Sequence, residues 1–379
     1  VTVQAEIIDL MRNLKDKLNS AVLLITHDMG VVADLADRIL VMKDGFTVEQ
    51  GTADQIFNAP QHPYTQSLLA SVPKLGSVPV RARVAEGNEA VLSLRDVTIE
   101  YPKRGRVPAF TAAQGISLDI YPGEILGLVG ESGSGKTISA LSVLGLLPEG
   151  AKVTGRIQWN GQNLLRLSEK QMRGIRGREI AMVFQEPMTA LNPLFTIGDQ
   201  IVEAVQVHEP SLPMSKCIER AVQMLDRTGI PNPKEKFYAY PHQLSGGQRQ
   251  RAMIAMALAC KPRLLIADEP TTALDVSLRL QILDLLKELQ EESKDDGGMG
   301  ILLITHDLNL VKHFAQRVAV LNQGNLMESG STKQVFEHPE DPYTRALVNS
   351  EPVRDLAPLM PLAPVLLKTE ELSVAYPSS

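Results

Sequence analysis

The stretch GEILGLVGESGSGKT, residues 123–137, decides the fold. Its first half, GEILGLVG (123–130), is an apolar run that we expect to form a buried strand. Its second half, GESGSGKT (130–137), has the form G-x-x-x-x-G-K-[ST], and ISALSVLGLL (138–147) follows with helical spacing. A strand, a glycine-rich turn and a helix are the context in which this motif holds phosphates. The sequence therefore predicts an α/β domain with a phosphate-binding loop.

The residue types in this loop suit a phosphate ligand. Glycines let the backbone curl so that successive N–H groups point at the phosphates, and the start of a helix adds positive potential there. We expect Lys136 to bring a charge to the β- and γ-phosphates and the hydroxyl of Thr137 to coordinate Mg²⁺. The remaining residues of the predicted cradle are Gly130, Glu131, Ser132, Gly133, Ser134 and Gly135.

A second buried strand is predicted at LLIA (264–267), and it ends in Asp268 and Glu269. Parallel sheets place ligands at the carboxyl ends of their strands, so this acidic pair should emerge beside the phosphate loop. Adjacent residues on an extended strand point in opposite directions. We therefore expect two roles: Asp268 holds Mg²⁺ through its water shell, and Glu269 orients and polarises an attacking water.

The chain also repeats itself. LLITHD occurs at 23–28 and 302–307, HPYTQSLLASVP (62–73) matches DPYTRALVNSEP (341–352), and VLSLRDVTIEYP (91–102) resembles VLLKTEELSVAYP (365–377). The period of about 275 residues has the size of a whole domain, not of a solenoid repeat. The matches recur in the same order, which disfavours the alternative of two unrelated domains.

The repeat predicts the layout of the chain. We expect the end of one copy at 1–75, a linker at 76–90, a complete copy at 91–350, a proline-rich linker at 351–364 and the first strand of another copy at 365–379. The first copy contains a histidine, His27, but no phosphate loop or acidic pair, so it cannot form a nucleotide site within this chain. It should bury little core, and we expect it to be partly disordered or to compete with 276–350 for one sheet edge. The absence of an initiator Met suggests a fragment.

The segment LSGGQRQR (244–251) narrows the class of protein. Ser245 can cap a helix, and the glycines after it expose backbone N–H groups. With this segment, the motif order across 91–350 resembles the ABC ATPase family. The resemblance implies a P-loop NTPase fold of the ABC cassette type: a RecA-like parallel-sheet core, an antiparallel β subdomain and a helical signature subdomain. It also implies that 1–75 and 365–379 are pieces of neighbouring cassettes.

The resemblance implies roles for further residues. Two cassettes of this family sandwich two ATP molecules, so Ser245, Gly246 and Gly247 would contact the γ-phosphate held by a partner cassette. Tyr101 would stack on adenine; the alternative is a core tyrosine at a strand end. Gln185 would sense Mg²⁺ and the attacking water, Asp275 would bridge the two sites, and His306 would contact the γ-phosphate. Catalysis would thus depend on Glu269, His306, Gln185 and Lys136, and Mg²⁺ on Thr137, Gln185 and Asp268.

Three segments look like the ATPases of dipeptide and oligopeptide importers: FQEPMTALNPLFTIGDQI (184–201), YPHQLSGGQRQR (240–251) and HPYTQSLL (62–69). Joined cassettes resemble the fused ATPases of some peptide and glutathione importers. This resemblance implies an ATPase that powers uptake of peptides or related small solutes at the cytoplasmic face of the bacterial inner membrane. Its partners would be a second cassette, transmembrane permease subunits that dock at 191–205, and indirectly an extracytoplasmic solute-binding protein. No iron–sulfur cluster is expected, because neither tail carries cysteine.

Composition limits the alternatives. The net charge of −6 does not indicate a broad nucleic-acid surface, and no apolar run reaches the roughly 18 residues of a membrane span. The start lacks the pattern of a secretory signal, and the two cysteines are far apart, which favours packed thiols. A soluble ABC ATPase of DNA repair or translation is one alternative, although zinc modules, long coiled coils and basic arms are not visible. A non-catalytic cassette fragment is the other.

Overall fold

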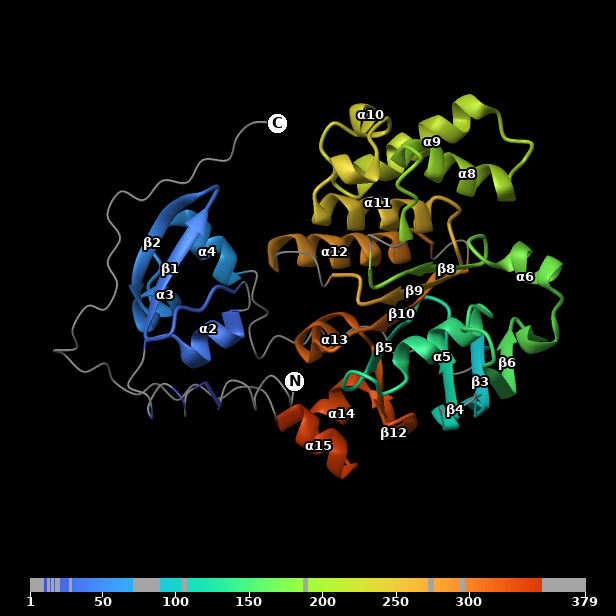
Figure 1. Ribbon diagram of the computed structural model, residues 1–379, viewed down its shortest axis with the longest axis horizontal. Coiled ribbons are helices and arrows are strands. Elements are labelled where there is room, and N and C mark those ends of the chain that lie inside the picture. Colours follow the sequence, from blue (N-terminus) through green and yellow to red (C-terminus); the bar gives the residue numbers. More distant parts are fainter. Residues whose placement is uncertain are drawn as a thin grey trace. The chain divides into compact units, whose positions relative to one another are not determined.

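We describe the protein from a computed structural model, which defines the placement of residues 10–11, 14, 17, 21–26, 29–70, 89–103, 108–186, 190–271, 276–293 and 297–349. The chain divides into two compact units (Figure 1). The larger unit lies within residues 73–350, and the smaller unit contains residues 2–72. Each unit is described by itself.

A six-stranded sheet forms the centre of the larger unit. Its order is β12-β11-β5-β10-β9-β8, in which β12 is antiparallel to β11 and the other neighbours are parallel. The strands are β5 (Ile125–Val129), β8 (Ile180–Val183), β9 (Leu264–Asp268), β10 (Gly300–Ile304), β11 (Arg317–Asn322) and β12 (Asn325–Ser331). Both strands predicted beside the phosphate loop and the acidic pair are confirmed. All residues of β5, β9 and β10 are buried, as expected for parallel strands covered on both faces.

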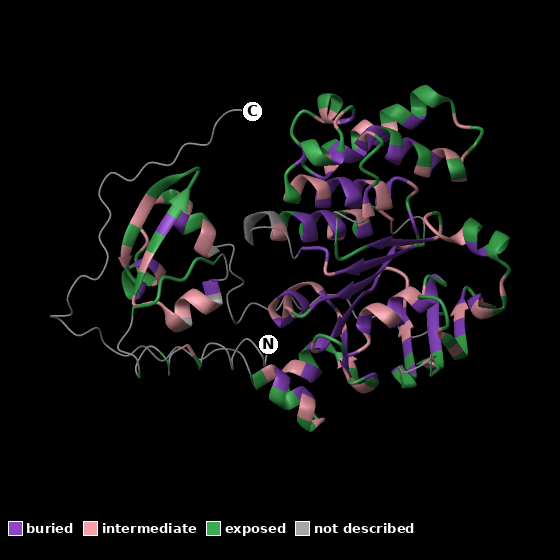
Figure 2. Cartoon of the chain, viewed as in Figure 1, coloured by how far each residue is buried: buried purple, intermediate pink, exposed green. Residues whose placement is uncertain are grey.

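Alternate side chains of β5 enter two different cores. Ile125 and Val129 join the core under the helices α8 (Ile197–His208), α9 (Met214–Arg227), α11 (Gly246–Leu258) and α12 (Val276–Glu292). Leu126 and Leu128 join the core on the other face, with α5 (Lys136–Val143) and a four-stranded antiparallel sheet. That sheet has the order β4-β3-β6-β7, formed by β3 (Leu92–Tyr101), β4 (Phe110–Ile120), β6 (Lys152–Trp159) and β7 (Gln162–Asn163). Figure 2 shows the buried central strands between these layers.

Short helices complete the larger unit. They are η1 (Leu164–Arg166), α6 (Glu169–Ile175), α10 (Pro233–Lys236), η2 (Pro241–Gln243), α13 (Leu308–Phe314), α14 (Thr332–Glu337) and α15 (Pro342–Asn349). Across the described residues of both units, every helix is too short or too polar to cross a bilayer.

The smaller unit repeats the last elements of the larger one. It contains α2 (Met29–Leu35), β1 (Arg38–Lys43), β2 (Phe46–Thr52), α3 (Ala53–Asn58) and α4 (Pro63–Ala70). Each of these five elements begins and ends 279 positions before its counterpart in the larger unit. The counterparts are, in order, α13, β11, β12, α14 and α15. The hairpin even has its bulge at the same place, between Val41 and Met42 in one copy and between Val320 and Leu321 in the other.

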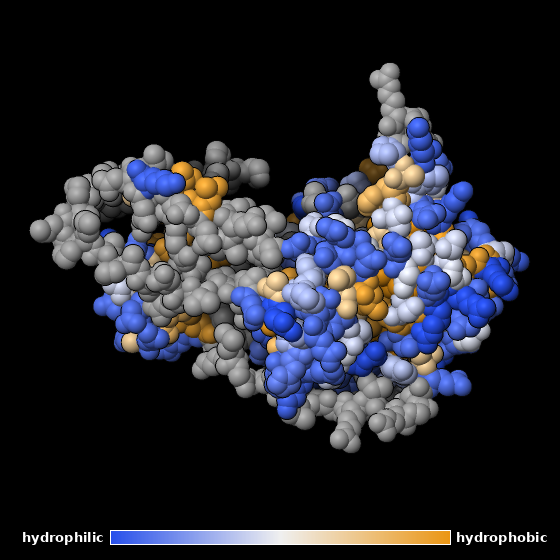
Figure 3. All heavy atoms as spheres, turned by 90° about the horizontal axis from the view of Figure 1, so that it is seen from below, coloured by the Kyte–Doolittle hydropathy of each residue, from blue (hydrophilic) through white to orange (hydrophobic). Residues whose placement is uncertain are grey.

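The surroundings of the two hairpins differ. Strand β11 pairs with β5 as well as β12, whereas β1 is found in a two-stranded sheet with β2. As a result Leu40 and Met42 are more than half exposed, while the equivalent Ala319 and Leu321 are fully buried. Figure 3 shows hydrophobic atoms open on the surface of the smaller unit. His27, most of the predicted linker 76–90 and residues 351–379 lie outside the described residues.

Candidate nucleotide site

The predicted phosphate loop joins the end of β5 to the start of α5. Two positions of this loop require glycine, because backbone atoms of other strands lie very close to them. A Cβ on Gly130, at φ 149°, would lie 2.1 Å from the carbonyl oxygen of Leu321. A Cβ on Gly135, at φ 97°, would lie 2.6 Å from that of Ala112. Because glycine has no side chain, the loop can pass this close to the neighbouring carbonyl groups. Ser132 and Gly133 remain exposed at the rim of the loop.

Lys136 is buried inside this loop. Its Nζ donates hydrogen bonds to the carbonyl oxygens of Gly130, at 2.9 Å, and Glu131, at 2.8 Å, and to Oγ of Ser134, at 3.3 Å. Burial lowers the pKa of the ammonium group, and the nearby carboxylates oppose that shift. Oxygen atoms of the loop itself therefore accept the hydrogen bonds that the Lys136 ammonium would donate to a bound phosphate.

Asp268 ends β9 and is buried beside the loop. Burial raises the pKa of this carboxyl, and the nearby hydroxyl of Thr137 opposes that shift. Oδ1 of Asp268 is buried without a hydrogen-bond partner among the described residues. A hydroxyl and an orphaned carboxylate oxygen are hard ligands that fit Mg²⁺. The described residues contain no cluster of three or more His, Cys, Asp or Glu that could hold a metal, so this pair would share the ion with phosphate and water.

Glu269 occupies the centre of a polar triad. Its Oε2 accepts a hydrogen bond from Nε2 of Gln185 at 2.9 Å, and its Oε1 lies 3.1 Å from Nδ1 of His306. The His306 contact is the main reason that the pKa of Glu269 lies below its usual value. Since the pKa of Asp268 is raised and that of Glu269 is lowered, the two adjacent carboxyls are electrostatically distinct.

The backbone between these two carboxyls differs from the sequence expectation. An extended strand through both residues is wrong, because β9 ends at Asp268 and Glu269 has a left-handed φ of 45°. The N–H of Glu269 donates to the carbonyl of Ile304 at 2.9 Å, which fixes this turn against β10. The different directions of the two side chains thus arise from a turn and not from strand alternation.

The segment LSGGQ begins α11, as predicted. Oγ of Ser245 accepts from the N–H of Gln248 at 3.3 Å, and the side chain of Gln248 accepts from the N–H of Ser245 at 3.3 Å. This reciprocal capping box leaves Ser245 and Gly246 exposed and Gly247 half-buried. Among the described residues, no hydrogen bond joins this helix start to the phosphate loop of the same unit.

Tyr101 is not part of this triad. Tyr101 is half-buried at the end of β3 and packs against the core that contains Leu126, and its hydroxyl has no partner among the described residues. Both alternatives for Tyr101 therefore stay open. Asp275 lies outside the described residues.

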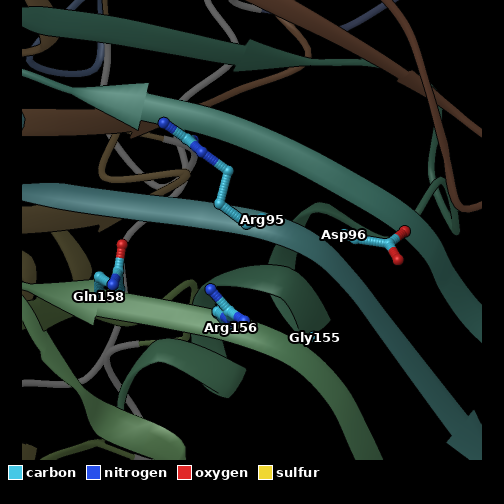
Figure 4. A pocket seen from close by; sticks show the side chains of 5 residues that line it. All are labelled: Arg95, Asp96, Gly155, Arg156 and Gln158. Atoms are coloured by element: carbon cyan, nitrogen blue, oxygen red, sulfur yellow. The ribbon is translucent and has the colours of Figure 1, made fainter.

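A hollow of about 560 Å³ lies elsewhere in the larger unit, on the ladder of β3 and β6. Figure 4 shows Arg95 of β3 and Arg156 of β6 on neighbouring strands, with Asp96, Gly155 and Gln158. None of the predicted site residues lines it.

The sheet order, the glycine-rich loop after β5 and the acidic residue at the end of β9 define a P-loop nucleotide-binding protein. Comparisons narrow this class. Residues 113–272 match the family profile "ABC transporter", and residues 48–95 and 327–359 match "Oligopeptide/dipeptide transporter, C-terminal region". Residues 113–272 therefore belong to the ABC transporter family.

Individual relatives agree with this assignment. The chain is 42% identical to the glutathione import ATP-binding protein GsiA of Escherichia coli strain K12, over 94% of this chain and 60% of that protein. The chain thus spans about 60% of the length of the curated relatives it matches. Among solved structures it resembles the ATP-binding cassette MJ0796 in a dimeric post-hydrolysis state with ADP and Pi, at 29% identity and a TM-score of 0.56, over 64% of this chain and 98% of that one. It also resembles cbiO1 of Clostridium perfringens, at 29% identity and a TM-score of 0.54, over 66% and 92%.

Proposed function

We propose that this chain binds and hydrolyses ATP and powers an importer for peptides or related small solutes. The observation that carries the proposal is the position of Glu269. It is ionised, held between Gln185 and His306, and adjacent in sequence to Asp268. A carboxylate fixed by two side chains can orient a water for in-line attack on the γ-phosphate, while Asp268 and Thr137 would hold Mg²⁺.

The remaining loop residues would bind the nucleotide. On ATP binding, Lys136 would exchange the carbonyls of Gly130 and Glu131 for phosphate oxygens, which keeps its charge satisfied in a buried place. The backbone N–H groups of the cradle and the start of α5 would take the other phosphate oxygens. Mg²⁺ would supply charge neutralisation between the β- and γ-phosphates.

A second cassette would complete each site. The capped start of α11 is a helix N-terminus of the kind that binds anions, and its first residues are exposed, yet no described hydrogen bond joins it to the phosphate loop of the same unit. We assign Ser245, Gly246 and Gly247 to a nucleotide held by a partner cassette, and Asp275 to the contact between the two. Under this proposal 91–350 is the complete cassette, 1–75 and 365–379 belong to neighbouring cassettes, and 76–90 and 351–364 are linkers.

The partners proposed in the membrane are permease subunits, served by an extracytoplasmic solute-binding protein. Near 191–205 the helical layer carries exposed apolar side chains: Leu194, Phe195, Met214 and Tyr238. A groove of about 320 Å³ between α8 and α9 includes the last two. Such a surface suits a short helix of a membrane subunit, which would place the chain at the cytoplasmic face of the inner membrane. The solute class rests on the profile match at 327–359 and on the name of the glutathione-import relative.

The test compares three full-length chains: the unaltered protein, Glu269→Gln and Lys136→Ala. Glu269→Gln should keep Mg-ATP binding and lose at least about 100-fold in hydrolysis, since it removes one acid–base group. Lys136→Ala should lose binding. Hydrolysis at the unaltered rate by Glu269→Gln would refute the role of Glu269. An unaltered chain that binds ATP without turnover would indicate a non-catalytic fragment, and tight, salt-sensitive nucleic-acid binding would indicate the soluble repair or translation class.

A further inference from the structure

The last elements of the larger unit contact the phosphate loop at two points. The N–H of Gly324, in the turn between β11 and β12, donates to the carbonyl of Ser134 at 3.1 Å. The N–H of Glu131 donates to the hydroxyl of Tyr343, on α15, at 3.4 Å. Glu131 and Tyr343 are 212 positions apart, so this second contact is not visible in the local sequence. It joins the first turn of the loop to the terminal helix.

A series of hydrogen bonds holds Tyr343 in this place. The two carboxylate oxygens of Glu328, on β12, accept from the N–H groups of Glu340 and Asp341, each at 3.1 Å. Oδ1 of Asp341 in turn accepts from the N–H groups of Tyr343 at 2.8 Å and Thr344 at 3.2 Å. The turn before α15 is therefore fixed to the sheet, and the helix start is capped. Tyr343 lies in the first turn of that helix, so the bonds that fix the helix start also fix Tyr343.

Burial also favours the neutral form of the Tyr343 hydroxyl. Its ring packs against the helical core, and burial raises the pKa of its hydroxyl above the usual value. The phenol thus stays protonated at neutral pH, and its oxygen can accept the Glu131 N–H.

The contact matters most when nucleotide enters. In the present structure Lys136 holds the carbonyls of Gly130 and Glu131. A phosphate that takes Lys136 removes both of those bonds, but the bond from the Glu131 N–H to Tyr343 does not involve Lys136. Tyr343 then fixes the first turn of the loop while the rest of it rearranges.

We propose that Tyr343 is a positioning residue for the phosphate loop, through which the terminal helix α15 sets the affinity for nucleotide. The inference rests on the proposed nucleotide site and adds a residue that lies outside its motifs. In this assignment Tyr343 would touch neither phosphate nor Mg²⁺. It acts through its hydrogen bond with the N–H of Glu131. Without the Tyr343 hydroxyl, this half-buried N–H group would lose that acceptor.

The smaller unit provides a control within the same chain. Tyr64 occupies the position of Tyr343, and Glu49 accepts there from the N–H groups of Gln61 at 2.7 Å and His62 at 3.1 Å. Nδ1 of His62 accepts from the N–H of Tyr64 at 3.1 Å, and the Tyr64 ring carries the ammonium of Lys43 at 5.0 Å from its centroid. The same turn thus forms in the smaller unit, whose described residues include no phosphate loop. The contact to Glu131 belongs to Tyr343 alone of the two tyrosines, while the Lys43 ammonium lies over the Tyr64 ring.

The experiment compares Tyr343→Phe with Tyr64→Phe in the full chain, with Mg-ATP as the titrant in calorimetry. Loss of one hydrogen bond should raise the Kd of Tyr343→Phe about three- to tenfold. The kcat at saturating ATP should stay within about twofold, because Tyr343 does not touch the reacting atoms. In Tyr343→Phe the nucleotide-free chain should lose no more stability than one hydrogen bond contributes and should stay folded at the assay temperature. Tyr64→Phe should unfold and bind as the unaltered chain does.

Three results would overturn the inference. They are an unchanged or tighter Kd in Tyr343→Phe, an equal weakening in Tyr64→Phe, and a weakening that arises because the nucleotide-free Tyr343→Phe chain is already partly unfolded at the assay temperature. The unaltered chain and Lys136→Ala separate this failure from that of the proposed function. If the unaltered chain does not bind Mg-ATP, the nucleotide site itself is wrong.

Discussion

Replacement of Arg317 by Met should destabilise the larger unit strongly. Its Nη1 lies 3.0 Å from Oε1 of Glu124, whose side chain is fully buried, and it also donates to the carbonyl of Asp119 at 3.2 Å. The guanidinium lies over the Tyr121 ring, 5.5 Å from its centroid. Without Arg317, the buried carboxylate of Glu124 keeps the N–H of Tyr121 as its hydrogen-bond donor, at 2.9 Å. A charge is then buried without its counter-ion.

The size of the effect follows from this burial. Removal of one partner of a buried ion pair costs about 3–5 kcal/mol. Because the Arg317 side chain is 25% exposed, we expect the lower end, about 3 kcal/mol. With a urea m-value of about 3 kcal/mol/M, the midpoint should fall by about 1 M. Trp159 is the single tryptophan of the chain and is buried in β6, so its fluorescence reports unfolding of this unit.

Arg95→Met is the matched control. Arg95 also pairs with a carboxylate, Asp119 at 2.7 Å, but its side chain is 49% exposed. Exposed pairs contribute about 0–1 kcal/mol, so this variant should unfold within about 0.3 M of the unaltered chain. The double variant Glu124→Gln, Arg317→Met should regain most of the loss, because it removes the buried charge.

Lower pH should reduce the deficit of Arg317→Met. Burial raises the pKa of Glu124, and Arg317 opposes that shift. Without Arg317 the folded-state pKa rises further above the unfolded value, so the folded state takes up a proton and gains stability as the pH falls through it. A deficit equal to that of Arg95→Met at pH 7, or one that does not shrink by pH 5, would refute the reasoning.

Three further outcomes are expected. Gly135→Ala should lose Mg-ATP binding in calorimetry, because its Cβ would lie 2.6 Å from a carbonyl oxygen at a left-handed φ; normal affinity would contradict the close approach. Ser245→Ala should lose about 1 kcal/mol of stability in the Trp159 urea assay, and Ser245→Gly only a few tenths, because alanine removes the capping oxygen and glycine tolerates the position; equal losses would exclude the cap. At pH 8 both cysteines should react slowly with iodoacetamide by mass spectrometry and rapidly in urea, because Cys217 is fully buried and burial raises the pKa of Cys260; fast native labelling would contradict this.

The hexapeptide LLITHD marks where sequence reasoning reaches its limit. At 302–304 the segment lies in β10, between β5 and β9, and Leu302 and Ile304 are buried. At 23–26 the same residues form no strand, and Leu23 and Ile25 are 83% and 91% exposed. Identical local propensity therefore gives different structures, because a central parallel strand is stabilised by its two neighbours. The pattern predicted the strand correctly only where those neighbours are present.

Some features of the nucleotide site follow from local sequence, and others depend on contacts with distant parts of the chain. The loop, the helix start at Ser245 and the ends of β9 and β10 follow from local motifs with strand and helix flanks, and these were predictable. The left-handed turn at Glu269 was not, because it depends on a bond to Ile304 of a neighbouring strand. Nor was the contact between Glu131 and Tyr343, which requires the course of the whole chain. A repeated tyrosine after a repeated turn was the one available signal for it.

The duplicated hairpin and its flanking helices carry a consequence for how the larger unit assembles. Residues 29–70 reach the same element bounds as 308–349 even though, among the described residues, β1 pairs with β2 alone whereas β11 also pairs with β5. Contacts between residues near in sequence are therefore sufficient to shape this supersecondary unit, and such low-contact-order pieces form early. We expect 308–349 to behave as a foldon that is structured before the parallel strands dock, with the phosphate loop taking its shape last, against a support already in place.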